Sequence, residues 1–146
     1  MVVDHYQRLA TLLSDHVLWL EKGDEDEEGG VRADLRGANL RGTNFKDANL
    51  EGGDLRGADL RGTDFTRTTL EKSDLRGANL AGANLQFANL EGADLRGANF
   101  EKADLWGADL RGARLEGADF KGAAVVGAMI DGSGGVDYIL GDPGAE

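Results

Sequence analysis

The sequence predicts an all-β solenoid with four sides per coil. From Leu35 to Ile130, every fifth residue is large and apolar, which gives 20 five-residue units without an insertion. The phrase Asp-Leu-Arg-Gly-Ala begins at Asp34 and recurs three more times at intervals of 20 residues, so four units complete one coil. A period of five advances about 500° around an α-helix, so these apolar residues would not share one helical face. Internal repeats of this kind indicate a stack of similar coils.

Composition excludes several other classes of protein. The 146 residues include 23 glycines but one proline, which fits neither collagen nor a proline-rich linker. The absence of cysteine excludes disulfides and thiolate metal sites. The chain shows no secretory leader pattern and no apolar run near the roughly 20 residues that cross a bilayer. A cytoplasmic protein without membrane contact is therefore expected.

The net charge of −11 is concentrated at the two ends of the chain. Residues 1–30 hold eight acidic and two basic residues, and residues 133–146 hold three acidic residues and no basic one. Residues 31–132 hold 16 acidic and 14 basic residues. The repeat body is therefore expected to be nearly neutral.

Residues 1–23 are expected to form an N-terminal amphipathic helix that caps the coils. Asp4 and Gln7 have the spacing of a capping box, and Gly23 is a typical helix stop. An isolated helix of this length is marginal in water, so its apolar face should pack on the open first coil. That face is formed by residues at spacings of three and four, with two neighbours that widen it: Tyr6, Leu9, Leu13, Val17 and Leu20, with Leu12 and Trp19.

Residues 24–30 are expected to be a linker. The acidic run from Asp24 to Glu28 is followed by Gly29 and Gly30. Such a charge run is typical of a solvated connector, and the alternative is an acidic docking segment for a basic partner.

Each five-residue unit in residues 31–132 predicts a short strand followed by a corner. Side chains alternate between the two faces of a strand, so the large apolar residue and the small residue two places before it both point inward. The Asp or Asn before the large residue and the charged residue after it point outward. The fifth residue is usually Gly, which tolerates the backbone angles of a bend. The large residues are the predicted core: Leu35, Leu40, Phe45, Leu50, Leu55, Leu60, Phe65, Leu70, Leu75, Leu80, Leu85, Leu90, Leu95, Phe100, Leu105, Leu110, Leu115, Phe120, Val125 and Ile130.

Equivalent outward residues should form columns along the stack. Asp34 and Arg36 begin an Asp column and an Arg column, and in the fifth coil Arg114 and Glu116 exchange both signs together. A paired column of opposite charges would explain why the two residues change as a couple. Phe45 and Phe65 should stack inside the coils. A candidate acidic column is formed by Glu51, Glu71 and Glu91.

This motif resembles that of the pentapeptide-repeat family, whose consensus is Ala-(Asp/Asn)-Leu-X-X. The resemblance covers residues 31–132 and implies a right-handed quadrilateral β-helix of about five coils, here with an N-terminal α-helical cap. The stretch from Trp19 and Leu20 through Gly30, followed by residues 32–35, also resembles the lead-in of many bacterial members.

The last coil departs from the pattern. Ala124, Val126 and Met129 replace polar outward residues, and residues 133–146 follow as a tail, a cap strand or a dimerisation segment. Two alternatives stay open: the tail covers the apolar end of its own chain, or this end forms a homodimer interface. Family members often dimerise through the C-terminal coil, as the resemblance implies. The candidate interaction surface is formed by Phe87, Trp106, Val126, Met129, Tyr138, Ile139 and Leu140.

No catalytic, cofactor-binding or metal-binding residues are predicted. His5 and His16 are 11 residues apart, which is not the spacing that lets two helical side chains share a metal, and both are expected to be surface or capping residues. Calcium binding by the Asp column is disfavoured by the adjacent Arg column. Direct nucleic-acid binding is not expected either, because the repeat body has no basic excess.

The sequence therefore favours a non-enzymatic module that acts as a rigid scaffold and binds a protein partner. The alternative is a DNA mimic that protects or inhibits a type II topoisomerase such as gyrase, as the resemblance implies for some family members. That activity requires an acidic shaft, for which the acidic column and the acidic ends are the support. The sequence identifies neither the partner nor the pathway.

Overall fold

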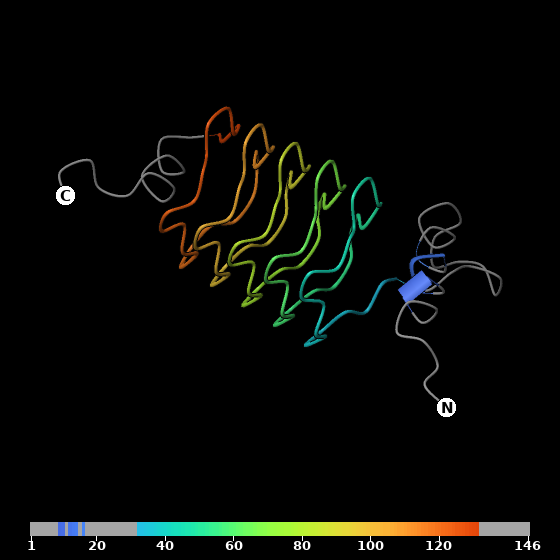
Figure 1. Cartoon of the computed structure of the whole chain (residues 1–146). Helices are drawn as coiled ribbons and strands as arrows, with labels where there is room; N and C mark the ends of the chain where they lie inside the picture. The colour runs from blue at the N-terminus through green and yellow to red at the C-terminus, as the bar shows by residue number, and fades with distance from the viewer. Residues whose placement is uncertain (1–8, 11, 15, 17–31, 132–146) are drawn as a thin grey trace.

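A computed structural model describes residues 9–10, 12–14, 16 and 32–131 (Figure 1). Residues 32–131 wind into a stack of four-sided coils, and residues 9–10, 12–14 and 16 are helical and lie beyond the first coil. Most of the helix expected at residues 1–23, the whole linker at 24–30 and the whole tail at 133–146 lie outside the described residues.

Each coil pairs with the next through one parallel bridge on every side. All 16 bridges join residues 20 positions apart, beginning with Asp34 to Asp54, and the sides form no longer strands. The 20-residue repeat therefore closes one coil, but each predicted strand is reduced to a single bridging residue. We number the sides 1 to 4 by their first apolar residues, which are Leu35, Leu40, Phe45 and Leu50.

Two backbone hydrogen bonds per unit hold neighbouring coils together. The bridging residue donates to the coil before it, as Asp54 N does to Ala33 O at 2.9 Å. The apolar residue donates to the coil after it, as Leu55 N does to Asp74 O at 2.8 Å. These bonds fix the register, because a shift by one residue would turn the apolar side chains outward.

The corner of each unit is a hydrogen-bonded turn. Gly57 has a φ of +65°, and the turn around it is closed by Ala58 N, which donates to Leu55 O at 3.1 Å. Positive φ at the third residue of a turn is the property that selects glycine there. Gly57 N also donates to Arg76 O of the next coil at 3.0 Å, so the corner contributes a third bond between coils.

In most units a side chain caps the amide of the residue that follows the apolar centre. The residue after the apolar centre has no backbone acceptor in the ladder, and the Oδ1 atom of the Asp or Asn two places before it accepts its N–H. For example, the N–H of Lys46 donates to Asn44 Oδ1 at an N···O distance of 2.9 Å. All 16 units with Asp or Asn at this position make the bond, at 2.9–3.4 Å. These side chains point outward, as the alternation predicts, and in addition they cap a backbone amide.

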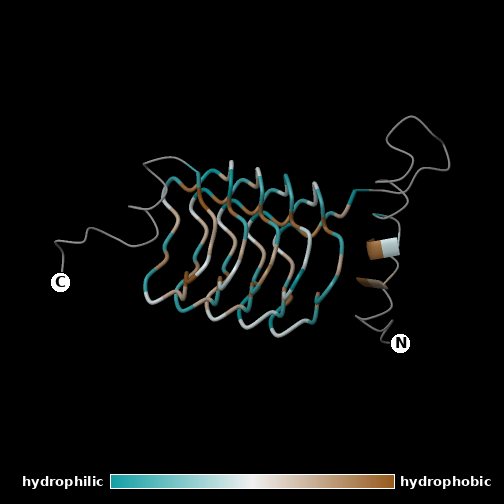
Figure 2. Ribbon diagram, turned by 90° about the horizontal axis from the view of Figure 1, so that it is seen from above, coloured by the Kyte–Doolittle hydropathy of each residue, from teal (hydrophilic) through white to brown (hydrophobic). Residues whose placement is uncertain are grey.

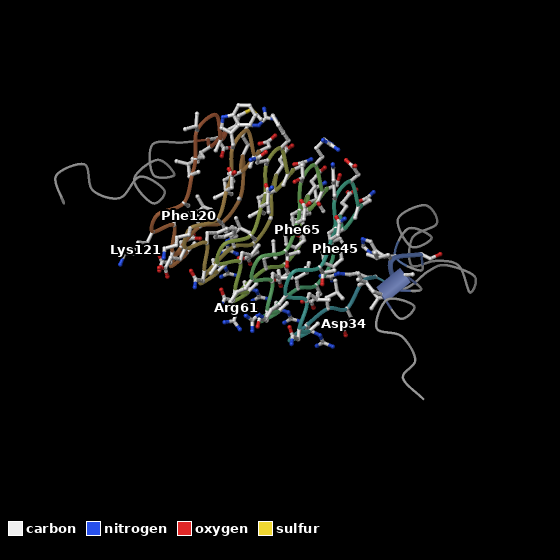
Figure 3. All side chains as sticks on the ribbon, in the orientation of Figure 1. Asp34, Phe45, Arg61, Phe65, Phe120 and Lys121 are labelled. Atoms are coloured by element: carbon white, nitrogen blue, oxygen red, sulfur yellow. The ribbon has the colours of Figure 1, made fainter. Side chains whose placement is uncertain are left out.

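The apolar residues fill the interior of the coils (Figure 3), and their positions recur from coil to coil (Figure 2). Eighteen of the 20 predicted core residues are at most 6% exposed. Val125 and Ile130, in the last described coil, are only partly buried and pack against the rest of the core. Two pairs of stacked rings, both from residues 20 positions apart, lie in this core: Phe45 on Phe65 at 5.3 Å between centroids, and Phe100 on Phe120 at 4.8 Å.

Small residues leave room for these large ones and bring few polar groups inside. The hydroxyls of Thr63 and Thr68 are buried, and each donates to a turn carbonyl of the preceding coil. The acceptors are Leu40 O at 3.0 Å and Phe45 O at 2.8 Å. Burial of a hydroxyl costs little once it has such a partner, so threonine substitutes for alanine at this position.

The N-terminal end of the stack contacts the helical residues. Leu9, Leu12 and Leu13 pack against the core of the coils. His16 is fully buried, and its Nδ1 atom accepts the N–H of Ala33 at 3.0 Å. Of the two positions expected for His16, at the surface or as a capping residue, the structure shows the second, because the buried imidazole caps the amide of Ala33.

Candidate functional site

The main apolar surface of the coils lies toward their C-terminal end. Phe87, Trp106, Val126 and Met129, which we call the aromatic cluster, are between 44% and 69% exposed. The Phe87 and Trp106 rings meet edge to face at 4.9 Å between centroids. Val126 follows Trp106 in the same column of side 3, and Met129 is the next bridging residue along the chain. Three other residues of the predicted surface lie outside the described residues: Tyr138, Ile139 and Leu140.

Phe87 occupies a corner that normally requires glycine. Its φ is +57°, a region that costs a non-glycine residue free energy. Its ring covers the corner of the next coil, since a Cβ atom on Gly107 would lie 2.8 Å from the ring. Gly107 therefore leaves space for the Phe87 ring. The backbone strain at Phe87 is the cost of holding this ring on the surface.

Polar contacts fix Trp106 on the same side. Both carboxylate oxygens of Asp104 are used: Oδ1 accepts the N–H of Trp106 at 3.1 Å, and Oδ2 accepts Gln86 Nε2 at 2.6 Å. Asp104 thus links Gln86 in the third coil to the backbone of Trp106 in the fourth coil, beneath the aromatic cluster.

Side 3 changes character along the stack. In the first two coils, Arg67 Nε lies 2.7 Å from Asp47 Oδ1, and Lys46 is exposed beside them. Both partners of this ion pair are corner residues with positive φ. From the third coil on, the equivalent positions are Phe87, Trp106 and Val126. The first two coils of side 3 therefore expose charged residues at and beside the corner, and the later coils expose large apolar residues beside the polar Gln86 and Asp104.

Side 1 carries a ladder of paired charges. Arg36 makes a bidentate pair with Asp34 and reaches Asp54 of the next coil at 3.8 Å. The pattern repeats up to Asp94, with cross-coil distances of 3.6 Å from Arg56 and Arg76. Hydrogen bonds from Arg36 lower the pKa of Asp34 to about 2. The lower edge of the stack in Figure 3 shows Asp34 and the similarly paired Arg61.

The exchange of signs in the fifth coil has an electrostatic explanation. Hydrogen bonding from Arg96 is the main cause that lowers the pKa of Asp94, and the charge of Arg114 lowers it further. Hydrogen bonding to Asp94 likewise raises the pKa of Arg96, and Glu116 adds to this effect. Each column of like charges therefore ends on an opposite charge.

Side 4 carries the candidate acidic column. Corner hydrogen bonds place Glu51, Glu71 and Glu91 in consecutive coils, and Glu71 lies 3.3 Å from Lys72 Nζ. Arg111 continues the column and pairs with Asp109 at 2.6 Å. The carboxylates of this side outnumber its cations by five to two, so side 4 is the acidic side of the stack.

Within residues 9–10, 12–14, 16 and 32–131, no group of three or more His, Asp or Glu side chains is placed to hold a metal ion. In the same residues there is no helix with the length and hydropathy to cross a membrane. The pKa of His16 is lowered, mainly by burial and further by the charge of Arg32. Glu51 acts in the opposite direction and raises this pKa, but its effect is the smaller one. The imidazole serves as a hydrogen-bond acceptor at the end of the stack.

The pentapeptide-repeat profile matches most of the chain, in eight copies over residues 31–67, 58–97 and 98–133. A pentapeptide repeat protein of the Arabidopsis thaliana thylakoid lumen is similar, with 36% identity and a TM-score of 0.63 over 64% of this chain and 66% of that one. The pentapeptide repeat protein Rfr23 from the cyanobacterium Cyanothece 51142 is 39% identical, with a TM-score of 0.40 over 75% of this chain and 70% of that one.

QnrB1, a plasmid-mediated fluoroquinolone resistance protein, is also similar. It is 24% identical and has a TM-score of 0.30 over 67% of this chain and 58% of its own. No curated protein matches the sequence.

Proposed function

The chain belongs to the pentapeptide-repeat family, and on that premise we propose that it is a non-enzymatic module that binds a protein partner. The aromatic cluster carries this proposal. It gathers four large apolar side chains, each 44% or more exposed, on one part of a coil stack whose other sides carry polar and charged residues. Contiguous exposed apolar surface usually marks an interaction site.

The strain at Phe87 supports the same function. A glycine at this corner would adopt the same φ at less cost, as it does at Gly107 and Gly127. The other non-glycine corners in this backbone region carry polar side chains, namely Asp47, Arg67, Lys72 and Lys102, so Phe87 differs from them in exposing a large apolar side chain at this cost.

The rest of the stack acts as the scaffold. Side 1 is neutral, since its five acidic residues face five basic ones, and each of its units is hydrogen-bonded through the backbone to a neighbouring coil. A partner is therefore expected to meet a preformed surface, which reduces the ordering cost of binding.

Affinity capture tests the proposal. The bait proteins are the wild type, a Trp106→Ser/Val126→Ser variant, and an Arg61→Ser control that alters side 2. We expect a partner that the wild type and the control retain and the cluster variant loses. Equal capture by all three baits, or a monomer without any partner, would argue against the proposed function.

A second candidate is regulation of a type II topoisomerase by DNA mimicry, which the acidic column on side 4 favours. Residues 32–131 have a net charge of only −2, from 16 acidic and 14 basic residues, so this column would have to supply most of the recognition. A supercoiling assay with purified gyrase tests this. Inhibition or protection that disappears in a Glu51→Gln/Glu71→Gln/Glu91→Gln variant is expected, and the absence of any effect at micromolar protein rejects the candidate.

A further inference from the structure

The aromatic cluster has an acidic rim, and we propose that it binds a cationic, amphipathic segment of its partner. This inference rests on the proposed function and specifies the chemistry of the partner. The segment would place apolar side chains on the cluster and Lys or Arg side chains on the rim.

The rim is formed by carboxylates that the coils hold beside the apolar residues. Asp104 is bonded to the backbone of Trp106, and Asp109 is the bridging partner of Met129. Asp131 lies two residues beyond Met129, and its Oδ1 accepts the N–H of Gly112 at 2.7 Å.

Among the residues that the structure describes, Arg111 is the cation that forms an ion pair with one of these three carboxylates. Arg111 pairs with Asp109 at 2.6 Å, which leaves the rim with a net negative charge. The rim therefore attracts cations and repels anionic segments.

The two aromatic rings reinforce this preference. Phe87 is 50% exposed and Trp106 is 45% exposed, so part of each ring is open to solvent. The face of an aromatic ring attracts Lys and Arg side chains, and the attraction strengthens when the partner displaces water. Rings and carboxylates together favour an Arg- or Lys-rich segment with apolar anchors.

Charge also disfavours the occupants that the chain itself could provide. Residues 133–146 contain three acidic residues and no basic one, so they would bring further negative charge to the rim. A second copy of the chain carries the same acidic rim and the same net charge of −11. A cationic segment from another protein is the complementary choice.

Peptide binding to the full-length chain tests the inference. The probes are a synthetic amphipathic helical peptide of Leu and Lys, and its counterpart with Glu in place of every Lys. A Trp19→Phe background leaves Trp106 as the sole tryptophan, so its fluorescence reports occupation of the cluster. We expect the Leu/Lys peptide to shift this fluorescence and to bind at least about tenfold more tightly than the Leu/Glu peptide.

Matched variants separate this site from general attraction to an acidic protein. Phe87→Gly keeps the corner geometry, and Asp104→Asn keeps the acceptor for Trp106 N while it removes one rim charge. Each should weaken the Leu/Lys peptide several-fold, whereas Glu71→Gln on side 4 should change its affinity less than about twofold. Equal losses in all three variants, or equal binding of both peptides, would overturn the inference and leave the proposed function untouched.

Two further outcomes would assign the cluster to the chain itself. The chain has no cysteine, so a Val126→Cys/Ile139→Cys pair can be oxidised without competing thiols. A disulfide within one chain would show that the tail covers the cluster, and a disulfide between chains would show a homodimer. Either result, in high yield and absent from an Arg41→Cys/Ile139→Cys control, contradicts the inference.

Discussion

Inward and outward positions within one unit differ sharply in what they tolerate. Leu75 is fully buried, and Leu75→Asp would place an unpaired charge in the core. We expect a loss of at least about 4 kcal/mol in the free energy of unfolding, enough to abolish the fold. Arg76→Ser, on the exposed side of the same unit, should cost far less, as is usual for an exposed ion pair. Urea titrations followed by circular dichroism compare the two variants, and similar tolerance would refute the assignment of faces.

Corner glycines are needed for two separable reasons. Gly77 and Gly107 have φ values of +66° and +67°, but a Cβ atom meets nothing within 4 Å at Gly77 and meets the Phe87 ring at Gly107. Gly77→Ala should therefore cost only the backbone strain, about 1–2 kcal/mol. Gly107→Ala should cost more, because the Phe87 ring must also shift to make room for the Cβ atom.

A double variant provides the control for this prediction. In a Phe87→Gly background the clash is absent, so Gly107→Ala should cost as little as Gly77→Ala. Thermal or urea unfolding is measured for the wild type, the three single variants Gly77→Ala, Gly107→Ala and Phe87→Gly, and the double variant Phe87→Gly/Gly107→Ala. An unchanged penalty in the double variant would show that the ring is not the cause.

At the scale of the structural element, the first coil depends on one neutral imidazole. His16 Nδ1 accepts an N–H and must be unprotonated to do so. Because burial lowers its pKa in the folded state, the unfolded chain binds the proton more readily. This contribution to stability is therefore complete above about pH 6.5 and is lost as the pH falls below that value.

His16→Asn tests the contribution of the imidazole. The Asn Oδ1 atom occupies the place of Nδ1 and can accept the Ala33 N–H, but it does not titrate. Urea midpoints measured at pH 7 and pH 5 should differ less for this variant than for the wild type. If both proteins respond to pH in the same way, protonation of His16 does not matter to the end of the stack.

The ion pairs on side 1 contribute stability that is lost at a lower pH than the contribution of His16. Arg36 holds the pKa of Asp34 at about 2, below the value near 3.9 in an unfolded chain. Depressed carboxylate pKa values stabilise the fold above about pH 4, and this contribution is lost as the pH falls toward about 2.

A substitution within the ladder isolates the charge. Asp74→Asn keeps an oxygen that can accept the Arg76 N–H, as Asn does in other units, and removes one ionised partner. The variant should lose less stability than the wild type between pH 4 and pH 2 in urea titrations. A steeper loss than in the wild type would contradict the role of the paired charges.

At the scale of the whole molecule, periodicity is the property that made the fold predictable. The spacing of Leu35, Leu55 and Leu75 determines both the coil length and the interior, and the stack of Phe45 on Phe65 follows from the same register. Val125 and Ile130 follow the same period, but they lie in the last coil of the bridge ladder and are less buried than the residues of the inner coils. Periodicity describes the middle of a solenoid better than its ends.

Features that do not repeat every five residues could not be predicted from the sequence in this way. His16 lies in a segment without repeats, so no register assigns it to Ala33. Each Asp or Asn side chain caps one backbone amide. This amide can be identified only once the hydrogen bonds between coils show which N–H has no backbone acceptor. For the aromatic cluster, the order of the chain indicated that Trp106 and Val126 are neighbours, whereas the strain at Phe87 required its φ angle.

The interchangeable units give the molecule two distinct ways to change in length. Because every unit presents the same inward pattern and four units close a coil, removal of one unit would leave the core intact. It would turn everything downstream by a quarter of a revolution, so that the aromatic cluster would face the direction of a neighbouring side. Removal of four units would instead slide the cluster along the axis by roughly 4.8 Å without turning it. Deletion of a single unit would therefore change the direction that the binding surface faces. Deletion of a whole coil would change only its position along the axis of the stack.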